Sequence, residues 1–129
     1  MSSGPSSQRQ GYSRVVLLVG TFADPGLLGK TLERAGFAVH TATVEQALDN
    51  ATELNAGALI IGVGLAVKDR IRVAPYARRH NPNVRIIVLY RGSIDNAEMA
   101  DAVLNAAVDP QDLLQALQEL LTGAPKRTG

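Results

Sequence analysis

The chain has 129 residues, of which 46% are hydrophobic and 19% are charged, and its formal net charge is +1. This length and composition are typical of one soluble globular domain, and the nearly neutral charge gives no reason to expect nucleic acid or an anionic membrane as a partner. The sequence contains no cysteine, which excludes disulfides, thiolate catalysis and cysteine metal sites and favours a cytoplasmic location.

The two ends of the sequence differ in composition from its middle. Residues 1–13 are rich in Ser, Gly, Gln and Pro and have no apolar stretch, so they predict a disordered tail rather than a signal peptide or membrane anchor. Residues 122–129 include Gly123, Pro125 and two basic side chains, which predicts a flexible C-terminal tail. One structured domain is therefore expected over residues 14–121.

The structured region opens with a strand and a helix. Residues 15–19 are a continuous apolar run that ends at Gly20, which is the pattern of a strand buried on both faces of a parallel sheet. Asp24 and Pro25 suit the N-cap and the first position of a helix, because the carboxylate accepts a free N–H and proline needs none. Gly36 predicts the end of this helix.

A second strand, a second helix and a third strand follow. Residues 37–42 alternate in the manner of a short strand, and Thr43 can cap a helix over residues 44–54. The third strand, residues 58–61, is an apolar run that stops at Gly62. No side chain with acidic or nucleophilic chemistry stands at that strand end.

The middle of the chain predicts a third helix and a fourth strand. Residues 68–80 have helical character, but Pro75 removes an interior hydrogen bond, so we expect either a kink or a helix that begins near Ala74. Residues 84–90 form a fourth strand whose centre is apolar.

The last third of the chain predicts a short helix, a weak strand and a long amphipathic helix. A helix of two turns fits residues 94–101, residues 102–104 form the fifth strand, and Asp109 and Pro110 open the last helix. Five such strand–helix units predict an α/β fold, a five-stranded parallel sheet that is doubly wound into a three-layer α/β/α sandwich. Ligands of such sheets bind at the carboxyl ends of the strands.

This order of elements resembles the receiver domain of two-component response regulators, which has a flavodoxin-like fold. The most similar segments are residues 31–42, which look like the first helix and second strand, residues 83–89, which look like the fourth strand, and residues 108–114, which look like the entry to the last helix. The segment 90–106 is several residues shorter than a receiver has there. The resemblance therefore implies a shortened fourth helix and an altered output face.

The resemblance also implies where a phosphotransfer site would lie. A receiver needs a magnesium-binding acidic pair after strand one, an acceptor aspartate after strand three, a hydroxyl after strand four and a lysine after strand five. The corresponding positions hold neutral or unsuitable residues: Gly20, Thr21, Gly62, Tyr90 and Ala106. The sequence therefore predicts a degenerate, phosphorylation-independent pseudo-receiver, not an enzyme and without a cofactor, which signals through an unidentified protein partner or as a homodimer.

An alternative function is a flavodoxin-like module that binds a nucleotide or another anion at the ends of strands one and three. Its candidate ligand loop consists of Gly20, Thr21, Phe22, Asp24 and Gly26, with Gly62 and Gly64 opposite. Turn geometry alone also explains these glycines, and Asp24 would repel an anion. Asp24 could be a displaced metal ligand, but helix capping explains it more simply.

The sequence offers less support for a metal site, a hydrolase site or a basic binding surface. His40 and His80 have no second histidine or cysteine near them in the sequence, and Ser93 is the only serine beyond the N-terminal segment, so we predict neither a metal site nor a hydrolase. A candidate interaction surface is the group of arginines in the middle of the chain: Arg70, Arg72, Arg78, Arg79 and Arg91. The favoured interpretation is a solvated helix face with scattered pairing to Asp69 and Asp95.

Overall fold

The computed structural model describes residues 13–48, 56–65, 67–91, 100–122 and 127–128. The predicted N-terminal tail lies outside these residues except for Ser13, whose hydroxyl accepts a hydrogen bond of 3.1 Å from the backbone N–H of Val15. Most of the segment expected to form the shortened fourth helix, residues 94–99, also lies outside them.

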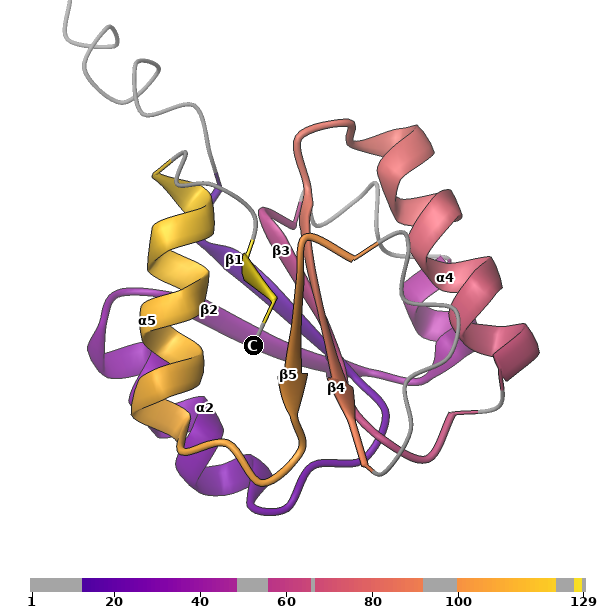
Figure 1. The fold of residues 1–129 in the computed structure, drawn as a ribbon. Helices are drawn as coiled ribbons and strands as arrows, with labels where there is room; N and C mark the ends of the chain where they lie inside the picture. Colours follow the sequence, from indigo (N-terminus) through magenta and orange to yellow (C-terminus); the bar gives the residue numbers. More distant parts are fainter. Residues whose placement is uncertain (1–12, 49–55, 66, 92–99, 123–126, 129) are drawn as a thin grey trace, which may run out of the picture.

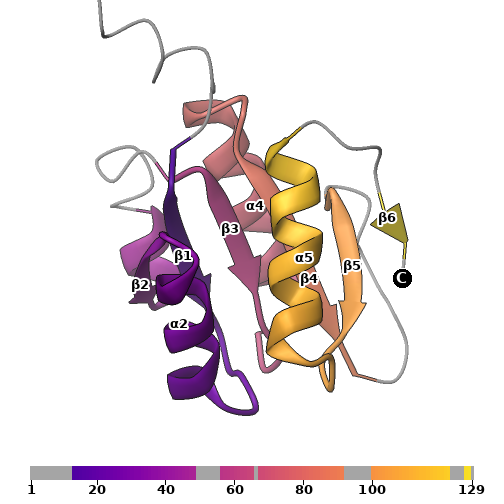
Figure 2. The ribbon, with the colours of Figure 1, turned by 90° about the vertical axis from the view of Figure 1, so that its left-hand side faces the viewer.

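The strands form one sheet in which all neighbours are parallel. The sheet order is β2-β1-β3-β4-β5-β6. The strands are β1 (Val15–Val19), β2 (Ala38–Ala42), β3 (Ala58–Ile61), β4 (Arg85–Tyr90), β5 (Ala102–Asn105) and β6 (Arg127–Thr128). Figure 1 labels the first five between the helices, and Figure 2 also labels β6. The first five strands have the order of the predicted flavodoxin-like fold, so the predicted fold class is confirmed.

Helices cover both faces of the sheet (Figures 1 and 2). Helices α2 (Pro25–Arg34) and α5 (Pro110–Leu121) pack on one face, where they bury leucines such as Leu32 and Leu117. Helix α4 (Val67–His80) and a helix whose described part is residues 44–48 contribute to the core of the other face. The three-layer arrangement follows because each central strand must bury both of its faces.

The alternation of side chains along β1 explains why the strand reads as a continuous apolar run. Val16 and Leu18 point into the core under α2 and α5, whereas Leu17 and Val19 point into the core under α4. All four are at most 2% exposed, so both faces of this strand require apolar residues. The structure thus confirms the strand that the sequence predicts.

The predicted helix starts are confirmed by their caps. The carboxylate of Asp24 accepts the N–H of Leu27 at 3.0 Å, and that of Asp109 accepts the N–H of Gln111 at 2.9 Å. Thr43 and Gln46 exchange two hydrogen bonds of 3.0 and 3.1 Å, in which each side chain accepts the backbone N–H of the other residue. Such reciprocal pairs satisfy N–H groups that the first turn of a helix cannot pair.

Of the two alternatives predicted for the third helix, a kink at Pro75 or a start near Ala74, the start near Ala74 is wrong. Helix α4 begins at Val67 and contains Pro75 in its interior. Proline removes the hydrogen bond to the carbonyl of Ile71, but Val73, Ala74 and Ala77 are at most 6% exposed on the inner face of the helix. Burial of this face compensates for the missing bond, and tertiary packing overrides the local preference.

The structure adds a sixth strand that the sequence analysis did not predict. Strand β6 lies within the segment expected to be a flexible tail, residues 122–129, and pairs with β5 in parallel. Among the residues that the structure describes, none of the helices combines the length and the apolar character that a membrane span needs.

Candidate functional site

The loops that follow β1 and β3 are joined directly to each other. Thr21 and Val63 form an antiparallel bridge, in which the Thr21 N–H donates to the Val63 carbonyl at 2.8 Å and the Val63 N–H donates to the Thr21 carbonyl at 3.0 Å. The Gly62 N–H donates to the carbonyl of Val19 at 2.8 Å. Because β1 and β3 are parallel neighbours, these bonds close the carboxyl edge of the sheet between them.

Gly62 is a position where the structure leaves no room for a side chain. A Cβ atom placed on this residue would overlap the carbonyl oxygen of Thr21 and lie 3.0 Å from Cζ of Phe22. Gly62 is buried, so the overlap could not be relieved toward solvent. The backbone of the β1 loop and the ring of Phe22 therefore occupy the space that a side chain at the end of β3 would need.

Two further glycines of the candidate ligand loop have structural roles. Gly20 and Gly64 have φ angles of 102° and 91°, in the left-handed region that other residues avoid. A Cβ atom on Gly20 would also lie 2.6 Å from Cδ1 of Leu65. These requirements explain both glycines without a ligand. Gly26 differs from them, because a Cβ atom placed on it would have Asp24 Oδ1, at 3.8 Å, as its only neighbour within 4 Å.

The ends of β4 and β5 are joined in a second place on the same edge. The Ala106 N–H donates to the Tyr90 carbonyl at 2.7 Å, which places the two predicted pocket positions side by side. Tyr90 and Ala106 are both half-buried. Phe22 connects the two halves of the edge, because it approaches Gly62 and also lines a hollow together with Ala106.

This hollow has a volume of about 90 Å³ and lies between the N-termini of α2 and α5. Its lining is mainly apolar: Phe22, Ala23, Asp24, Leu27, Leu28, Leu89, Ala106, Val108, Pro110 and Leu113. The carboxylate of Asp24 is engaged with the N–H of Leu27. A cavity of this size holds waters or one side chain, whereas small-molecule sites are about 300–1,000 Å³.

Several backbone N–H groups that could bind an anion at this edge are already paired. The N–H groups of Thr21, Gly62 and Val63 all donate within the bridged loops. At the start of α2, Pro25 has no N–H and the N–H of Leu27 donates to Asp24. An anion nest needs N–H groups that converge on an open space, and these groups point at protein oxygens instead.

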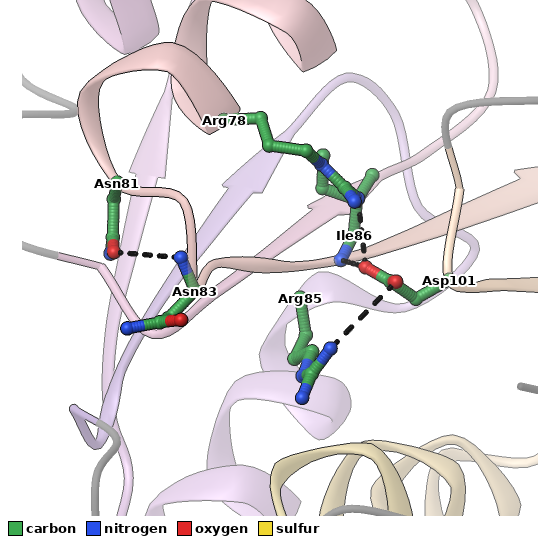
Figure 3. Close-up of polar contacts among 6 residues, drawn as sticks. All are labelled: Arg78, Asn81, Asn83, Arg85, Ile86 and Asp101. Carbon is green, nitrogen blue, oxygen red and sulfur yellow. Dashed lines mark hydrogen bonds and ion pairs between the residues drawn. The ribbon is translucent and has the colours of Figure 1, made fainter. Parts of the chain in front are cut away.

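The candidate arginine surface is divided by the structure. Arg78 donates to Asp101 Oδ2 at 2.9 Å, so it is engaged at the start of β5, and this oxygen also accepts the N–H of Ile86 at 2.8 Å (Figure 3). Arg85 Nη1 lies 4.0 Å from Asp101 Oδ1. No sequence pattern indicates Asp101 as the partner of these arginines, because the residues lie far apart in the chain.

The remaining arginines lie on or after α4. Arg72 pairs with Asp69 at 3.4 Å, as expected, while its side chain stays 53% exposed. Arg79 is exposed on the same helix, and Arg91 is exposed after the end of β4. The side chain of Arg70 and the whole of Asp95 lie outside the described part of the structure. Only Arg72 and Arg79 therefore remain as described arginines on an outward helix face.

No combination of metal-binding side chains is found in the described ranges: they contain no group of three or more His, Cys, Asp or Glu residues that could hold an ion. His40 is exposed on β2, at one edge of the sheet.

Comparison with solved structures finds receiver domains. A CheY-like response regulator receiver domain protein from Methanospirillum hungatei matches with a TM-score of 0.73 and 22% identity, over 84% of this chain and 94% of that chain. Chemotaxis protein CheY4 from Vibrio cholerae matches with a TM-score of 0.70 and 23% identity, over 84% and 98% of the two chains. The chain has the receiver fold.

A third match is the receiver domain of a sensor histidine kinase from Pseudomonas aeruginosa, whose structure has a magnesium ion coordinated in its active-site cleft. Its TM-score is 0.69, with 18% identity over 84% of this chain and 98% of that chain. No protein-family model matches the sequence, and no curated protein matches it significantly. The similarity thus lies in the arrangement of the elements.

Proposed function

We propose that this chain is a receiver-fold signalling module that works without phosphorylation, through contacts with a protein partner. The observation that carries the proposal is the close approach at Gly62, where the Thr21 carbonyl and the Phe22 ring occupy the space of a side chain. A receiver needs a carboxylate there as the nucleophile that attacks a phosphoryl group. The closed edge supports a scaffold role rather than a catalytic one.

The positions at which a receiver holds its magnesium ion support the same proposal. Magnesium in phosphotransfer sites is held by hard oxygen ligands, usually carboxylates. Gly20 and Thr21 offer no carboxylate, and Asp24, which follows them in the loop, caps α2. The Pseudomonas receiver, whose structure has a magnesium ion in its cleft, shares its fold with this chain, whereas Gly20 and Thr21 of this chain supply no carboxylate for such an ion.

The outward face of α4 is the surface that we propose for the partner. It carries Lys68, Ile71, Arg72 and Arg79, all exposed, on the side of the helix opposite the buried Val73, Ala74 and Ala77. Ile71 is 49% exposed, which places a large apolar side chain among cations. Arginine and apolar side chains together are typical of protein interfaces, so an acidic protein surface fits this face better than nucleic acid does.

The alternative, an anion-binding module, has less support. Its candidate loop would need free N–H donors, but those of Thr21, Gly62 and Val63 are used in the bridge between the loops. These paired groups favour the protein-interaction function.

The proposal is tested by incubation of the chain with acetyl phosphate and Mg²⁺, followed by intact-mass measurement under mild conditions. An authentic receiver domain in the same reaction serves as the positive control. We expect no phosphoryl adduct on this chain, and none on a folded Gly62→Asp variant, since the other site positions also lack their chemistry. A labile adduct on the unmodified chain would overturn the proposal.

A further inference from the structure

Strand β6 covers part of the outer edge of β5. Ala102 pairs with Arg127 and Val103 pairs with Thr128, while the other side of β5 pairs with β4 along its whole length. Figure 2 shows β6 at the end of the sheet, beyond β5. The predicted five-stranded fold would end at β5, so β6 changes which strand lies at this edge.

The other end of the β5 edge is closed by the turn that follows it. The N–H of Val108 donates to the Asn105 carbonyl at 2.9 Å, and the N–H of Ala107 donates to Asn105 Oδ1 at 2.8 Å. Only Leu104 lies between this turn and the residues that β6 covers. The two features together leave little of the β5 backbone available to another strand.

Without this cover, β5 would be a poorly protected edge. Its sequence, Ala-Val-Leu-Asn, has no charge and no proline, and Ala102 and Leu104 are only 0% and 7% exposed. The opposite edge strand, β2, exposes the polar residues His40 and Thr41. Apolar edges with free N–H and C=O groups pair readily with strands of other molecules, and natural proteins block them.

The segment that carries β6 has a composition suited to blocking an edge. The strand has two residues, includes Arg127, and follows Pro125 and Lys126 in the sequence. Short length, proline and basic side chains are the features by which natural edge strands avoid pairing. Strand β6, the outermost strand, is therefore protected against pairing with other molecules, whereas β5 without β6 is not.

We propose that the β5 edge is a strand-pairing surface for a second copy of this chain and that β6 keeps it closed. The seated β6 demonstrates that the edge accepts a strand, and a two-residue pairing is easily displaced because few hydrogen bonds hold it. Two exposed β5 edges can pair around a twofold axis, which closes the assembly at a dimer. This inference goes beyond the proposed function and does not depend on whether the chain is phosphorylated.

The test compares the intact chain with a variant that ends at Thr122 and so lacks β6. We expect the shortened chain to dimerise at concentrations about tenfold lower than the intact chain requires, as measured by sedimentation velocity. Hydrogen exchange should place the protection gained on dimerisation at the amides of β5 and not at those of β2. A folded shortened chain with the same association behaviour as the intact chain would overturn the proposal, as would new protection elsewhere.

Two full-length variants decide the question if the shortened chain does not fold. Thr128→Pro removes a backbone N–H from β6 and should promote association, whereas Thr128→Ala keeps that group and should behave as the intact chain does. Because the chain has no cysteine, Val103→Cys with Thr128→Cys can form a single cross-link that holds β6 on β5. The oxidised form should stay monomeric, and its dimerisation through β5 would contradict the proposal.

Discussion

At the scale of single residues, the most informative position is Gly62. A glycine at a strand end is often a turn residue, but the φ angles in the left-handed region belong to Gly20, Gly36 and Gly64, not to Gly62. What Gly62 requires is space, because the Thr21 carbonyl and the Phe22 ring pack against its Cα. The residue is glycine for the close approach of another chain segment.

This requirement makes a prediction about stability. Gly62→Ala should lower the free energy of unfolding by about 1–3 kcal/mol, the usual effect of overpacking a closed site, in urea denaturation. Gly29→Ala is the matched control. Gly29 lies inside α2, and a Cβ atom placed on it would meet no other atom within 4 Å. That substitution should raise stability by about 0.5–1 kcal/mol. Equal effects of the two substitutions would refute the close approach.

The sequence located this position but not its surroundings. The end of the apolar run after Ile61 and the resemblance to receivers both pointed to Gly62. Neither indicated that Thr21 pairs with Val63, because such a bridge joins two loops whose contact depends on how β1 and β3 align in space. The filling of the space by Phe22 follows from that bridge.

At the scale of elements, Asp101 joins three of them. Its carboxylate accepts bonds from Arg78 of α4 and from the Ile86 N–H of β4, and its own N–H donates to the Ile86 carbonyl at 2.7 Å just before β5 begins. Its side chain is only 18% exposed, so these bonds are partly shielded from water. Shielded, charge-assisted hydrogen bonds contribute more than exposed ones do.

We therefore expect Asp101→Asn to destabilise the chain by about 1–3 kcal/mol in urea denaturation. The control, Asp69→Asn, removes a carboxylate from the exposed pair with Arg72 and should change stability by less than about 0.5 kcal/mol. A change at Asp101 as small as that at Asp69 would show that its bonds do not hold α4, β4 and β5 together.

At the scale of the whole molecule, the receiver fold is present with its carboxyl edge closed by protein groups. The bridge between the β1 and β3 loops uses the N–H groups of Thr21 and Val63, and the neighbouring hollow of about 90 Å³ is lined mainly by apolar side chains. The paired N–H groups and the small apolar hollow favour the protein-interaction proposal over a nucleotide site.

Thermal unfolding with added ligands tests this view. A ligand at about 100 times its Kd would stabilise the native chain by roughly 2.7 kcal/mol and raise Tm by on the order of 10 °C. We expect no such rise with FMN, ATP or inorganic phosphate, with sodium chloride at equal ionic strength as the control. A saturable rise with any of them would favour the anion-binding alternative.

The sequence by itself determined the strands β1 to β5, the two capped helices α2 and α5, and the neutral residues at the strand ends. These features depend on local signals, namely apolar runs, N-cap residues and glycines, which act between neighbours in the chain. Only the tertiary structure decided that α4 continues through Pro75, that Asp101 binds Arg78, that β6 covers β5, and that Thr21 and Phe22 fill the space beside Gly62. Each depends on packing or pairing between distant segments, whose energy no local pattern records.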